Sequence, residues 1–374
     1  MKQPERILHF GIKYYPSQGG SSRVAELLVQ AGKSRADVSI FCYRNQRFRP
    51  EHNEGIHVIQ MPDMGSGSLS VFLYYALCCL HVLLFGKYDL IHVHKTDSAF
   101  FIPLLKLKAR VIATSQEAPY RRDKWSWLGK TYFRLMEKFF IHSGSVLTAV
   151  SLPLKQYYEE RYRRKVHFVP NFVDTTPVYD DAGAEELMLK HRISHGFLLF
   201  SARRIMSTKG CHTLMAALQK INYKGQVVII GQDSHAPEYS RKLRKLAGGL
   251  QVVFTGYVGD KPVLMSMIRK SRLFLFPSEN EGMSLMLLEA ASTATPIVAS
   301  DIPENSSVFT DEEVLFFRDK SADDLALKLG LAISNPNEMA SRAERARHKV
   351  KNNFSAHTVA EQYFELYDDS QVMV

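Results

Sequence analysis

The sequence predicts an α/β protein of two domains, each a doubly wound parallel sheet. Short runs rich in β-branched and aromatic residues alternate with helical stretches along most of the 374 residues, and this alternation is typical of parallel sheets covered by helices on both faces. The alternation stops near the middle of the chain and then restarts. The length also favours about two domains, and 45% hydrophobic residues can build their cores.

The first half contains six predicted strands and three clear helical stretches. The strands are RILHFGI (6–12), ADVSIFCY (36–43), YDLIHVH (88–94), ARVIAT (109–114), GSVLTAV (144–150) and KVHFVP (165–170). The helices cover 21–32, 69–86 and 125–140. Ligands of such sheets bind beyond the carboxyl ends of the strands, so we expect functional residues there.

PNFVDTTPVYDDAG (170–183) has two prolines and no periodicity, which indicates a linker. Strands then resume in the second half of the chain. They are GFLLFSA (196–202), QVVIIG (226–231), LQVVFTG (250–256), RLFLFPS (272–278) and TPIVAS (295–300). The sequence therefore predicts domains at 1–174 and 175–354, with a site in a cleft between them.

The formal charge is +10, and the excess cations gather in two segments. These are Arg121, Arg122, Lys124, Lys130, Arg134 and Lys138, and then Arg161, Arg163, Arg164 and Lys165. Such patches attract phosphates of nucleic acid, anionic lipid or a soluble nucleotide, and a solvated basic face is an equal alternative. The four cysteines show no C-x-x-C spacing, which favours a reducing compartment and no structural zinc. MKQPERILHFGI resembles no secretion signal.

LSVFLYYALCCLHVLLF (69–85) is the one segment that a membrane interpretation could use. Its 17 residues fall at the lower edge of the ~20 that a helix needs to cross a bilayer. Because a predicted strand follows almost at once, the sequence favours a buried or interface-lying helix over a spanning one.

Glycines and cations follow the first strand of each predicted domain. Gly19 and Gly20 precede a helix, where a close backbone approach and unpaired N–H groups suit an anion, although an ordinary glycine loop has the same pattern. No G-x-G-x-x-G is present, which disfavours a dehydrogenase. Arg204 and Lys209 precede a helix that begins near Gly210, and two cations there can neutralise a diphosphate. The chain has no P-loop motif.

FPSENEGMSLMLLEA (276–290) predicts a strand end, a loop with Glu281 and Gly282, and a helix from Ser284 that carries Glu289. Two acids eight positions apart would be ~12 Å apart on one continuous helix, which suits two ends of an extended ligand better than one shared bond. We expect the N–H groups of Met283, Ser284 and Leu285 to face the same anion as Arg204 and Lys209. Two solvated glutamates beside a core helix are the plainer alternative.

Six motifs together resemble the retaining glycosyltransferases of family 4, which have the GT-B fold of two Rossmann-like domains. They are YYPSQGG (14–20), VPNFVD (169–174), RRIMSTKG (203–210), the pair Glu281 and Glu289, its context EGMSLMLLEA (281–290) and TPIVASDIPE (295–304), in the family's order. The resemblance implies a UDP-sugar or GDP-sugar donor on the C-terminal domain and an acceptor on the N-terminal one. It also implies that the last helix (355–374) returns to the first domain.

The resemblance further implies roles for particular residues. Glu289 would bind the ribose and Glu281 the donor sugar, while Arg204 and Lys209 would hold the diphosphate as it leaves. Gly20 would close on the same phosphates, and Tyr257 and Val258 would lie near the base. No metal or other cofactor is expected, because cations and a helix N-terminus replace it.

One position departs from the family pattern. Many members have a histidine after the strand ARVIAT, but this chain has Gln116 there, followed by Glu117. Gln donates hydrogen bonds but cannot accept and return a proton. The position is therefore a positioning group, or Glu117 has replaced it, or the enzyme is slow or inactive. His92 and His94 share one face of their strand, so at least one approaches the acceptor or both are core residues.

RRDKWSWLGKTYFRLMEKFF (121–140) interleaves Trp125, Trp127, Phe133 and Phe139 with cations, a pattern of interfacial helices. It predicts peripheral contact with anionic lipid at the inner face of a membrane, and a helix on the domain surface is the alternative. The sequence thus predicts a glycosyltransferase acting on a glycan or lipid-linked acceptor in envelope or exopolysaccharide synthesis. A catalytically weak nucleotide-sugar-binding subunit is the alternative, and nucleic-acid binding is not expected.

Overall fold

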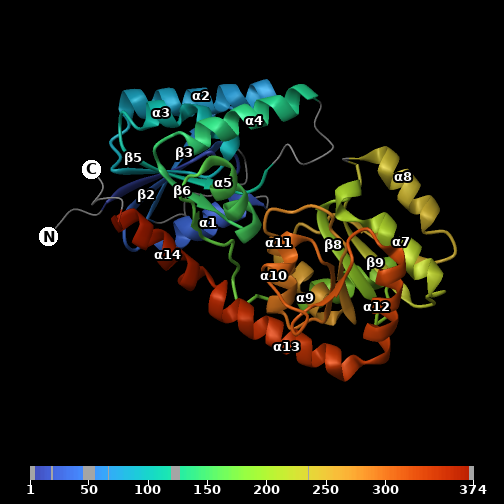
Figure 1. The fold of residues 1–374 in the computed structure, drawn as a ribbon. Coiled ribbons are helices and arrows are strands. Elements are labelled where there is room, and N and C mark those ends of the chain that lie inside the picture. The colour runs from blue at the N-terminus through green and yellow to red at the C-terminus, as the bar shows by residue number, and fades with distance from the viewer. Residues whose placement is uncertain are drawn as a thin grey trace. The chain divides into compact units, whose positions relative to one another are not determined.

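The computed structural model describes residues 5–17, 20–44, 55–65, 67–118, 127–234 and 236–369. The chain divides into two compact units: unit 1 is Met1–Phe172 with Ala356–Val374, and unit 2 is Val173–Ser355. The division falls two residues before the sequence-predicted boundary between 174 and 175. Figure 1 shows the elements of each unit.

Unit 1 contains a seven-stranded parallel sheet in the order β3-β2-β1-β4-β5-β6-β7. Its strands are β1 (Arg6–Phe10), β2 (Asp37–Tyr43), β3 (Ile56–Met61), β4 (Leu90–Val93), β5 (Arg110–Ser115), β6 (Val146–Ala149) and β7 (His167–Phe168). Its helices are α1 (Ser21–Gly32), α2 (Ser68–Phe85), η2 (Thr96–Phe101), α3 (Ile102–Leu105), α4 (Trp127–Ile141), α5 (Leu152–Tyr162) and α14 (Ala356–Asp369). The sequence did not predict β3, which pairs only with β2 at the sheet edge.

Side chains alternate across the central strands of this sheet, so each strand serves two different layers. Leu8 and Phe10 of β1 belong to the core with α2, η2, α3 and α4. His9, between them, faces the opposite side of the sheet. On that side α14 packs beside α1, with the Phe364 ring of α14 next to Gly32 of α1. The chain thus returns at its C-terminal end to close the face opposite α2.

Unit 2 contains a six-stranded parallel sheet in the order β10-β9-β8-β11-β12-β13. Its strands are β8 (Leu198–Arg204), β9 (Gln226–Gln232), β10 (Gln251–Gly256), β11 (Leu273–Phe276), β12 (Ile297–Ser300) and β13 (Leu315–Phe317). Its helices are α6 (Asp181–His191), η4 (Ser207–Lys209), α7 (Cys211–Lys220), α8 (Pro237–Leu246), α9 (Lys261–Lys270), α10 (Leu285–Ser292), α11 (Pro303–Ser306), α12 (Ala322–Ser334) and α13 (Pro336–Asn353). The prediction of two doubly wound parallel sheets is confirmed.

Both sheets reverse their strand order once. We call the place between the two strands where the order reverses the reversal point, and such folds bind ligands there. In unit 1 the reversal lies between β1 and β4, and in unit 2 it lies between β8 and β11. All the paired strands are parallel, so the segments that follow these strands emerge at the same edge of each sheet. The two reversal points therefore define where the candidate site residues should be sought.

Candidate functional site

In unit 2 the predicted cations and the first predicted acid follow the two strands at the reversal point. Arg204 is the last residue of β8, and Lys209 is the last residue of η4, a few residues further on. β11 ends at Phe276, and Glu281 lies in the loop that follows it. The structure thus brings together segments that are about seventy positions apart in the chain.

Lys209 and Glu281 form an ion pair across the reversal point. Lys209 Nζ lies 2.5 Å from Glu281 Oε1, and the Ser278 hydroxyl donates to the same oxygen at 2.5 Å. The Glu281 side chain is 9% exposed and that of Lys209 is 22% exposed. This partial burial makes the pair stronger than a surface ion pair, because fewer water molecules screen it. Glu281 is consequently held in one orientation by a cation and a hydroxyl.

Gly210 explains why the β8 and β11 loops can meet. Its φ is +69°, and a Cβ atom there would lie 1.8 Å from the carbonyl oxygen of Pro277. The backbone N–H of Glu279 also donates to the carbonyl oxygen of Thr208 at 2.9 Å. Any side chain at position 210 would push the two loops apart and separate Lys209 from Glu281.

The second predicted acid, Glu289, lies on α10 and pairs with a cation that the sequence analysis did not single out. Lys261 Nζ lies 2.5 Å from Glu289 Oε2. Lys261 is the first residue of α9, which Asp260 caps by accepting from the Val263 N–H. The loop with Tyr257 and Val258 directly precedes this helix, so the Lys261 pair links that loop to α10. Tyr257 is 54% exposed.

The residues between the two acids form a capped helix start. Ser284 is the N-cap of α10, and its hydroxyl accepts from the Leu287 N–H at 3.3 Å. Gly282 and Met283 complete the preceding loop, and Leu285 is the first helical residue. Helix starts present N–H groups without intrahelical partners, which suits an anion. The sequence predicted a loop at Glu281 and a helix from Ser284, and the structure agrees. Glu281 and Glu289 therefore do not share one continuous helix.

A further group of charges beside Glu281 was missed. His212 Nε2 lies 3.3 Å from Glu279 Oε1, and Lys320 Nζ lies 3.8 Å from Glu279 Oε2. Burial, together with Lys242 and Lys320, lowers the pKa of His212. Glu279 lies two residues before Glu281 in the same strand-end loop, and this position in the sequence could have identified it as a candidate site residue.

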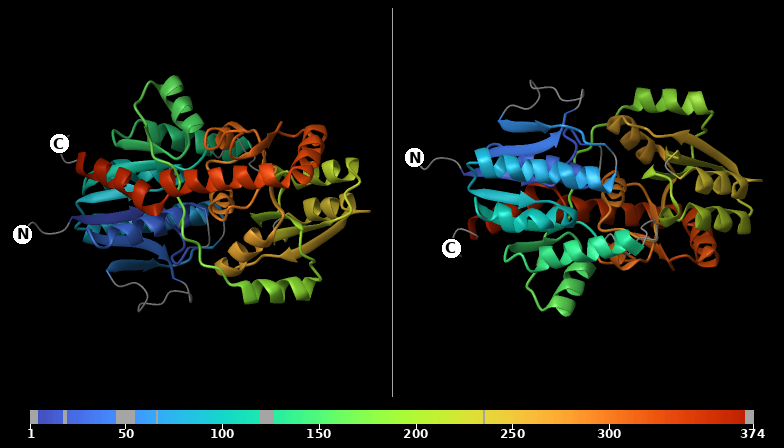
Figure 2. Two further views of the ribbon diagram at one scale, coloured as in Figure 1. Left: turned by 90° about the horizontal axis from the view of Figure 1, so that it is seen from below. Right: turned by 90° about the horizontal axis from the view of Figure 1, so that it is seen from above.

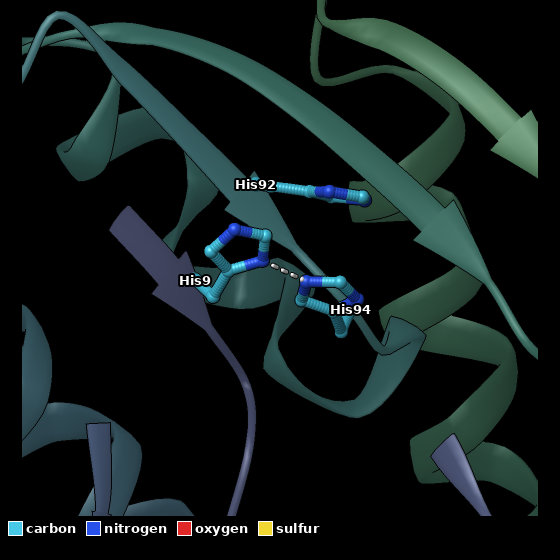
Figure 3. Close-up of side chains that lie close together, drawn as sticks. All are labelled: His9, His92 and His94. Carbon is cyan, nitrogen blue, oxygen red and sulfur yellow. Dashed lines mark hydrogen bonds between the residues drawn. The ribbon is translucent and has the colours of Figure 1, made fainter. Parts of the chain in front are cut away.

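In unit 1 the reversal point is occupied by three buried histidines, His9, His92 and His94 (Figure 3). His9 Nδ1 and His94 Nε2 are 2.7 Å apart and share a hydrogen bond. The His92 ring stacks on that of His94 with a centroid distance of 3.9 Å. Burial lowers the pKa of His9 to about 3 and those of His92 and His94 well below their usual value, so all three are neutral near pH 7.

His92 is buried and bonded within unit 1, which favours the core alternative for this residue over contact with an acceptor. Its Nδ1 bonds the Tyr367 hydroxyl of α14 at 2.7 Å, and its Nε2 bonds the Thr114 hydroxyl of β5 at 2.7 Å. His94 is also buried, at 1% exposure, which favours the core alternative for this residue as well. The physical reason is that α14, the last helix, covers this face of the sheet.

The three histidines are close enough to suggest a metal site, since their nearest ring nitrogens all lie within 4.8 Å of one another. Their bonding argues against it. Both nitrogens of His92 bond hydroxyl groups, and His9 and His94 bond each other. A divalent ion would also be a buried charge without a carboxylate in the group to balance it. The cluster is best described as a polar seam that joins β1, β4, β5 and α14.

The remaining predicted residues of unit 1 lie at strand and helix ends. Gln116 and Glu117 directly follow β5, and the side-chain nitrogen of Gln116 is buried without a hydrogen-bond partner. Such an amide lacks the bond that a buried donor normally makes. Gly20 is the N-cap of α1 with φ +59°, a conformation that favours glycine. Gly19 lies outside the described residues.

Two family models match this chain, and together they span most of it. "Glycosyl transferases group 1" matches residues 185–349, and "Glycosyltransferase Family 4" matches residues 18–177. The chain resembles the group 1 glycosyltransferases over both matched segments, and the matches identify it as a glycosyltransferase. The predicted family resemblance and the predicted enzyme class are confirmed, and these matches favour a transferase over a sugar-nucleotide-binding subunit.

Individual relatives of this glycosyltransferase agree with the family match. It is 24% identical over 279 residues to α-maltose-1-phosphate synthase of Mycolicibacterium smegmatis, covering 69% of this chain and 72% of that protein. Its fold resembles that of sucrose-phosphate synthase from Thermosynechococcus elongatus, with a TM-score of 0.83, 18% identity and coverage of 99% and 100% of the two chains.

A third similar protein was solved with ligands. Anabaena HepE in complex with UDP and glucose matches this glycosyltransferase with a TM-score of 0.80 and 16% identity, over 98% of this chain and 100% of that one. These solved structures confirm the GT-B fold class.

Proposed function

We propose that this glycosyltransferase moves a sugar from a UDP-sugar or GDP-sugar to a hydroxyl group of a glycan or lipid-linked acceptor, with retention of configuration. The observation that carries the proposal is the Lys209–Glu281 pair at the reversal point of the unit 2 sheet. It places a cation and a fixed carboxylate where parallel sheets bind their ligands. Envelope or exopolysaccharide synthesis is the setting that we propose.

The donor is held by unit 2 in this proposal. Arg204 and Lys209 bind the diphosphate, and the N-terminus of α10 at Met283, Ser284 and Leu285 adds N–H donors. When the bond between the sugar and the diphosphate breaks, the diphosphate keeps the electron pair and gains charge. Cations already in place stabilise that charge without reorganising at the moment of reaction. No metal is needed for this role.

The two acids bind the uncharged sugar and ribose groups at the two ends of the donor. Glu281 accepts hydrogen bonds from hydroxyl groups of the sugar, and Glu289 accepts them from hydroxyl groups of the ribose. Tyr257 and Val258 contact the base. Both carboxylates already have one cationic partner, Lys209 for Glu281 and Lys261 for Glu289. Such pairing keeps each acid oriented before the donor arrives, which reduces the ordering cost of binding.

Gln116 takes a positioning role in this proposal. Its unpaired amide nitrogen follows the carboxyl end of β5 in unit 1, and an amide N–H can donate to a sugar hydroxyl. Glu117 lies beside it and is the acidic alternative at this position. A glutamine cannot shuttle a proton, so catalysis by this chain relies on stabilising the leaving diphosphate.

A donor screen followed by a transfer assay tests the proposal. A correct nucleotide sugar at about a hundred times its Kd stabilises the folded protein by about 2.7 kcal/mol, which thermal-shift measurements detect. Glu281→Gln should retain binding of the free nucleoside diphosphate and lose sugar transfer. Stabilisation by no nucleotide sugar, or unchanged transfer in Glu281→Gln, would remove the proposal. Activity that persists in EDTA would support metal independence.

We further propose that the protein works in the cytoplasm, at the inner face of the cytoplasmic membrane. Part of the basic segment that suggested this from sequence, residues 121–126, lies outside the described residues. The rest begins α4, whose exposed residues include Trp127, Leu128, Arg134 and Lys138.

A further inference from the structure

The helix α2 exposes a continuous apolar face. Five leucines are between 36% and 71% exposed, namely Leu69, Leu73, Leu77, Leu80 and Leu84, and we call them the leucine face. At about 100° per residue they fall within an arc of about 80° of the helix. A soluble protein rarely presents so many large apolar side chains in one row, so this face marks an interaction surface.

The opposite side of α2 is fixed inside unit 1. Tyr74, Tyr75, Cys78, Cys79 and Val82 are all buried. The Tyr74 hydroxyl donates to the Ile12 carbonyl oxygen at 2.6 Å. Of the described helices, α2 is the one whose length and composition would allow it to cross a membrane. Crossing would strip this buried side from its core and leave its hydroxyl groups unpaired, so α2 can use a membrane only by lying along its surface.

Neighbouring helices extend the leucine face into a broader layer. Rings of α2, η2 and α4 touch, through the pairs Phe72–Phe100 and Phe100–Phe139 with centroid distances of 5.5 and 5.1 Å. α2, α3 and α4 lie side by side in the right-hand view of Figure 2. Exposed apolar side chains continue across them, as Phe100, Leu104, Leu107, Trp127, Leu128 and Leu135.

The charges of this layer all have one sign at the surface. Over Ser68–Lys87, Thr96–Lys108 and Trp127–Ile141, the charged residues that are exposed are Lys87, Lys106, Lys108, Arg134 and Lys138. The acids of these segments are Asp97, which is partly buried, and Glu137, which is 3% exposed and accepts from the Tyr162 hydroxyl. Cations around an exposed apolar row complement a surface that is apolar inside and anionic outside.

We propose that the leucine face and the α3 and α4 side chains beside it dock on a bilayer that contains anionic lipid, with α2 lying in the plane of the interface. This assignment rests on the proposed function only in explaining how unit 1 reaches a lipid-linked acceptor. Lysines near an anionic surface add electrostatic attraction and the leucines add apolar burial, so both components are needed for stable attachment.

Vesicle flotation of the full chain tests this proposal. Leu73→Ser with Leu80→Ser removes two leucines of the face that are 40% and 51% exposed. The matched control is Leu327→Ser with Leu331→Ser on α12 of unit 2, where the leucines are 61% and 46% exposed. We expect the parent and the control to float with phosphatidylglycerol vesicles and the α2 variant to lose at least about tenfold in partitioning. Pure phosphatidylcholine vesicles should bind the parent weakly.

Fluorescence reports the orientation of the layer. Trp125→Phe leaves Trp127, which is 75% exposed on α4, as the one tryptophan of the chain. Its emission should shift to the blue with anionic vesicles and stay unshifted with the α2 variant. Lys87→Gln, Lys108→Gln and Lys138→Gln together should reduce binding to anionic vesicles and leave any weak binding to phosphatidylcholine unchanged.

Several outcomes would overturn the assignment. These are no anionic-vesicle binding by the parent, equal losses in the α2 and α12 variants, or a parent dimer that the α2 variant dissociates, which would assign the face to a second copy. Resistance to alkaline carbonate extraction would indicate a spanning helix. Donor hydrolysis measured without vesicles on the same proteins separates the two proposals, because intact turnover with no lipid binding would remove the docking surface and leave the proposed function standing.

Discussion

The two units use the same sheet order around their reversal points but fill those points with opposite chemistry. In unit 2, charged side chains meet there and remain partly accessible, as in the Lys209–Glu281 pair. In unit 1, neutral histidines fill the equivalent position and are buried beneath α14. The difference teaches that strand topology selects where side chains gather, while the covering helices decide whether those side chains meet ligand or core.

The outer helices of the two units differ in how their exposed apolar side chains are arranged. Unit 1 exposes the leucine face with lysines beside it, whereas the exposed large apolar residues described in unit 2 are scattered. These are Val178, Leu189, Tyr257, Leu327 and Leu331. Unit 2 is thus suited to a charged, soluble ligand at its strand ends, and unit 1 to a surface contact through its helices.

Of the changes proposed here, lowering the pH should have the largest effect. It should lower the free energy of unfolding through the buried histidines of unit 1. The folded-state pKa of His9 is lowered to about 3 by burial, so its neutral form adds stability that is complete above the unfolded-state pKa of about 6.5 and is lost as pH falls toward 3. His92 and His94 shift in the same direction. Each histidine should lower the unfolding free energy by about 1.4 kcal/mol per pH unit below about pH 6.5.

Urea unfolding between about pH 7 and pH 5 measures this slope. His9→Asn, whose amide can replace the bond at Nδ1, should reduce the slope by the share of one histidine. His357→Asn is the control, because that histidine is on α14 and its side chain is 85% exposed. Equal slopes in the two variants would show that the buried seam does not titrate as described.

Arg204→Ala should have the largest effect in unit 2. Removal of a preorganised group that stabilises developing charge lowers kcat by about 10²–10³-fold. Arg203→Ala is the matched control, since Arg203 precedes it on β8 and is exposed. Steady-state kinetics with saturating donor measure the change. If both variants behaved alike, Arg204 would be only a surface cation and the diphosphate assignment would fail.

Glu289→Ala should weaken donor binding by roughly ten- to hundredfold, because hydrogen bonds to charged groups contribute about 1.5–3 kcal/mol. Calorimetric titration with the nucleoside diphosphate gives the Kd directly. Lys261→Ala provides the comparison, since it removes the cation of the pair and leaves the carboxylate. A loss in Lys261→Ala as large as that in Glu289→Ala would mean that the ion pair, rather than a ribose contact, sets affinity.

Ser284→Ala should have the smallest effect. Loss of this N-cap costs about 1 kcal/mol of stability and loosens the α10 start, so donor affinity should fall as well. Ser321→Ala removes the comparable cap of α12, where the serine hydroxyl accepts from Asp324 N–H at 3.2 Å. Similar thermal destabilisation with a changed donor Kd only in Ser284→Ala would separate the anion site from helix stability.

The sequence predicted most of the fold because its strong signals are local. Buried parallel strands such as LFLF (273–276) are continuous apolar runs with clear ends. β3 and β13 were missed, since β3 is a partly exposed edge strand and β13 has three residues. Short or half-exposed strands gain their stability from neighbours, which a pattern along the chain does not contain.

The sequence by itself determined the two sheets, the strand-end positions of Arg204, Lys209 and Glu281, and the helix that carries Glu289. Tertiary structure decided the partners: Lys261 for Glu289, Ser278 for Glu281, and Tyr367 for His92. It also decided which side of α2 is buried, because that helix is apolar all round. Periodicity follows from backbone geometry within a few residues, whereas burial and pairing depend on which distant segments pack together.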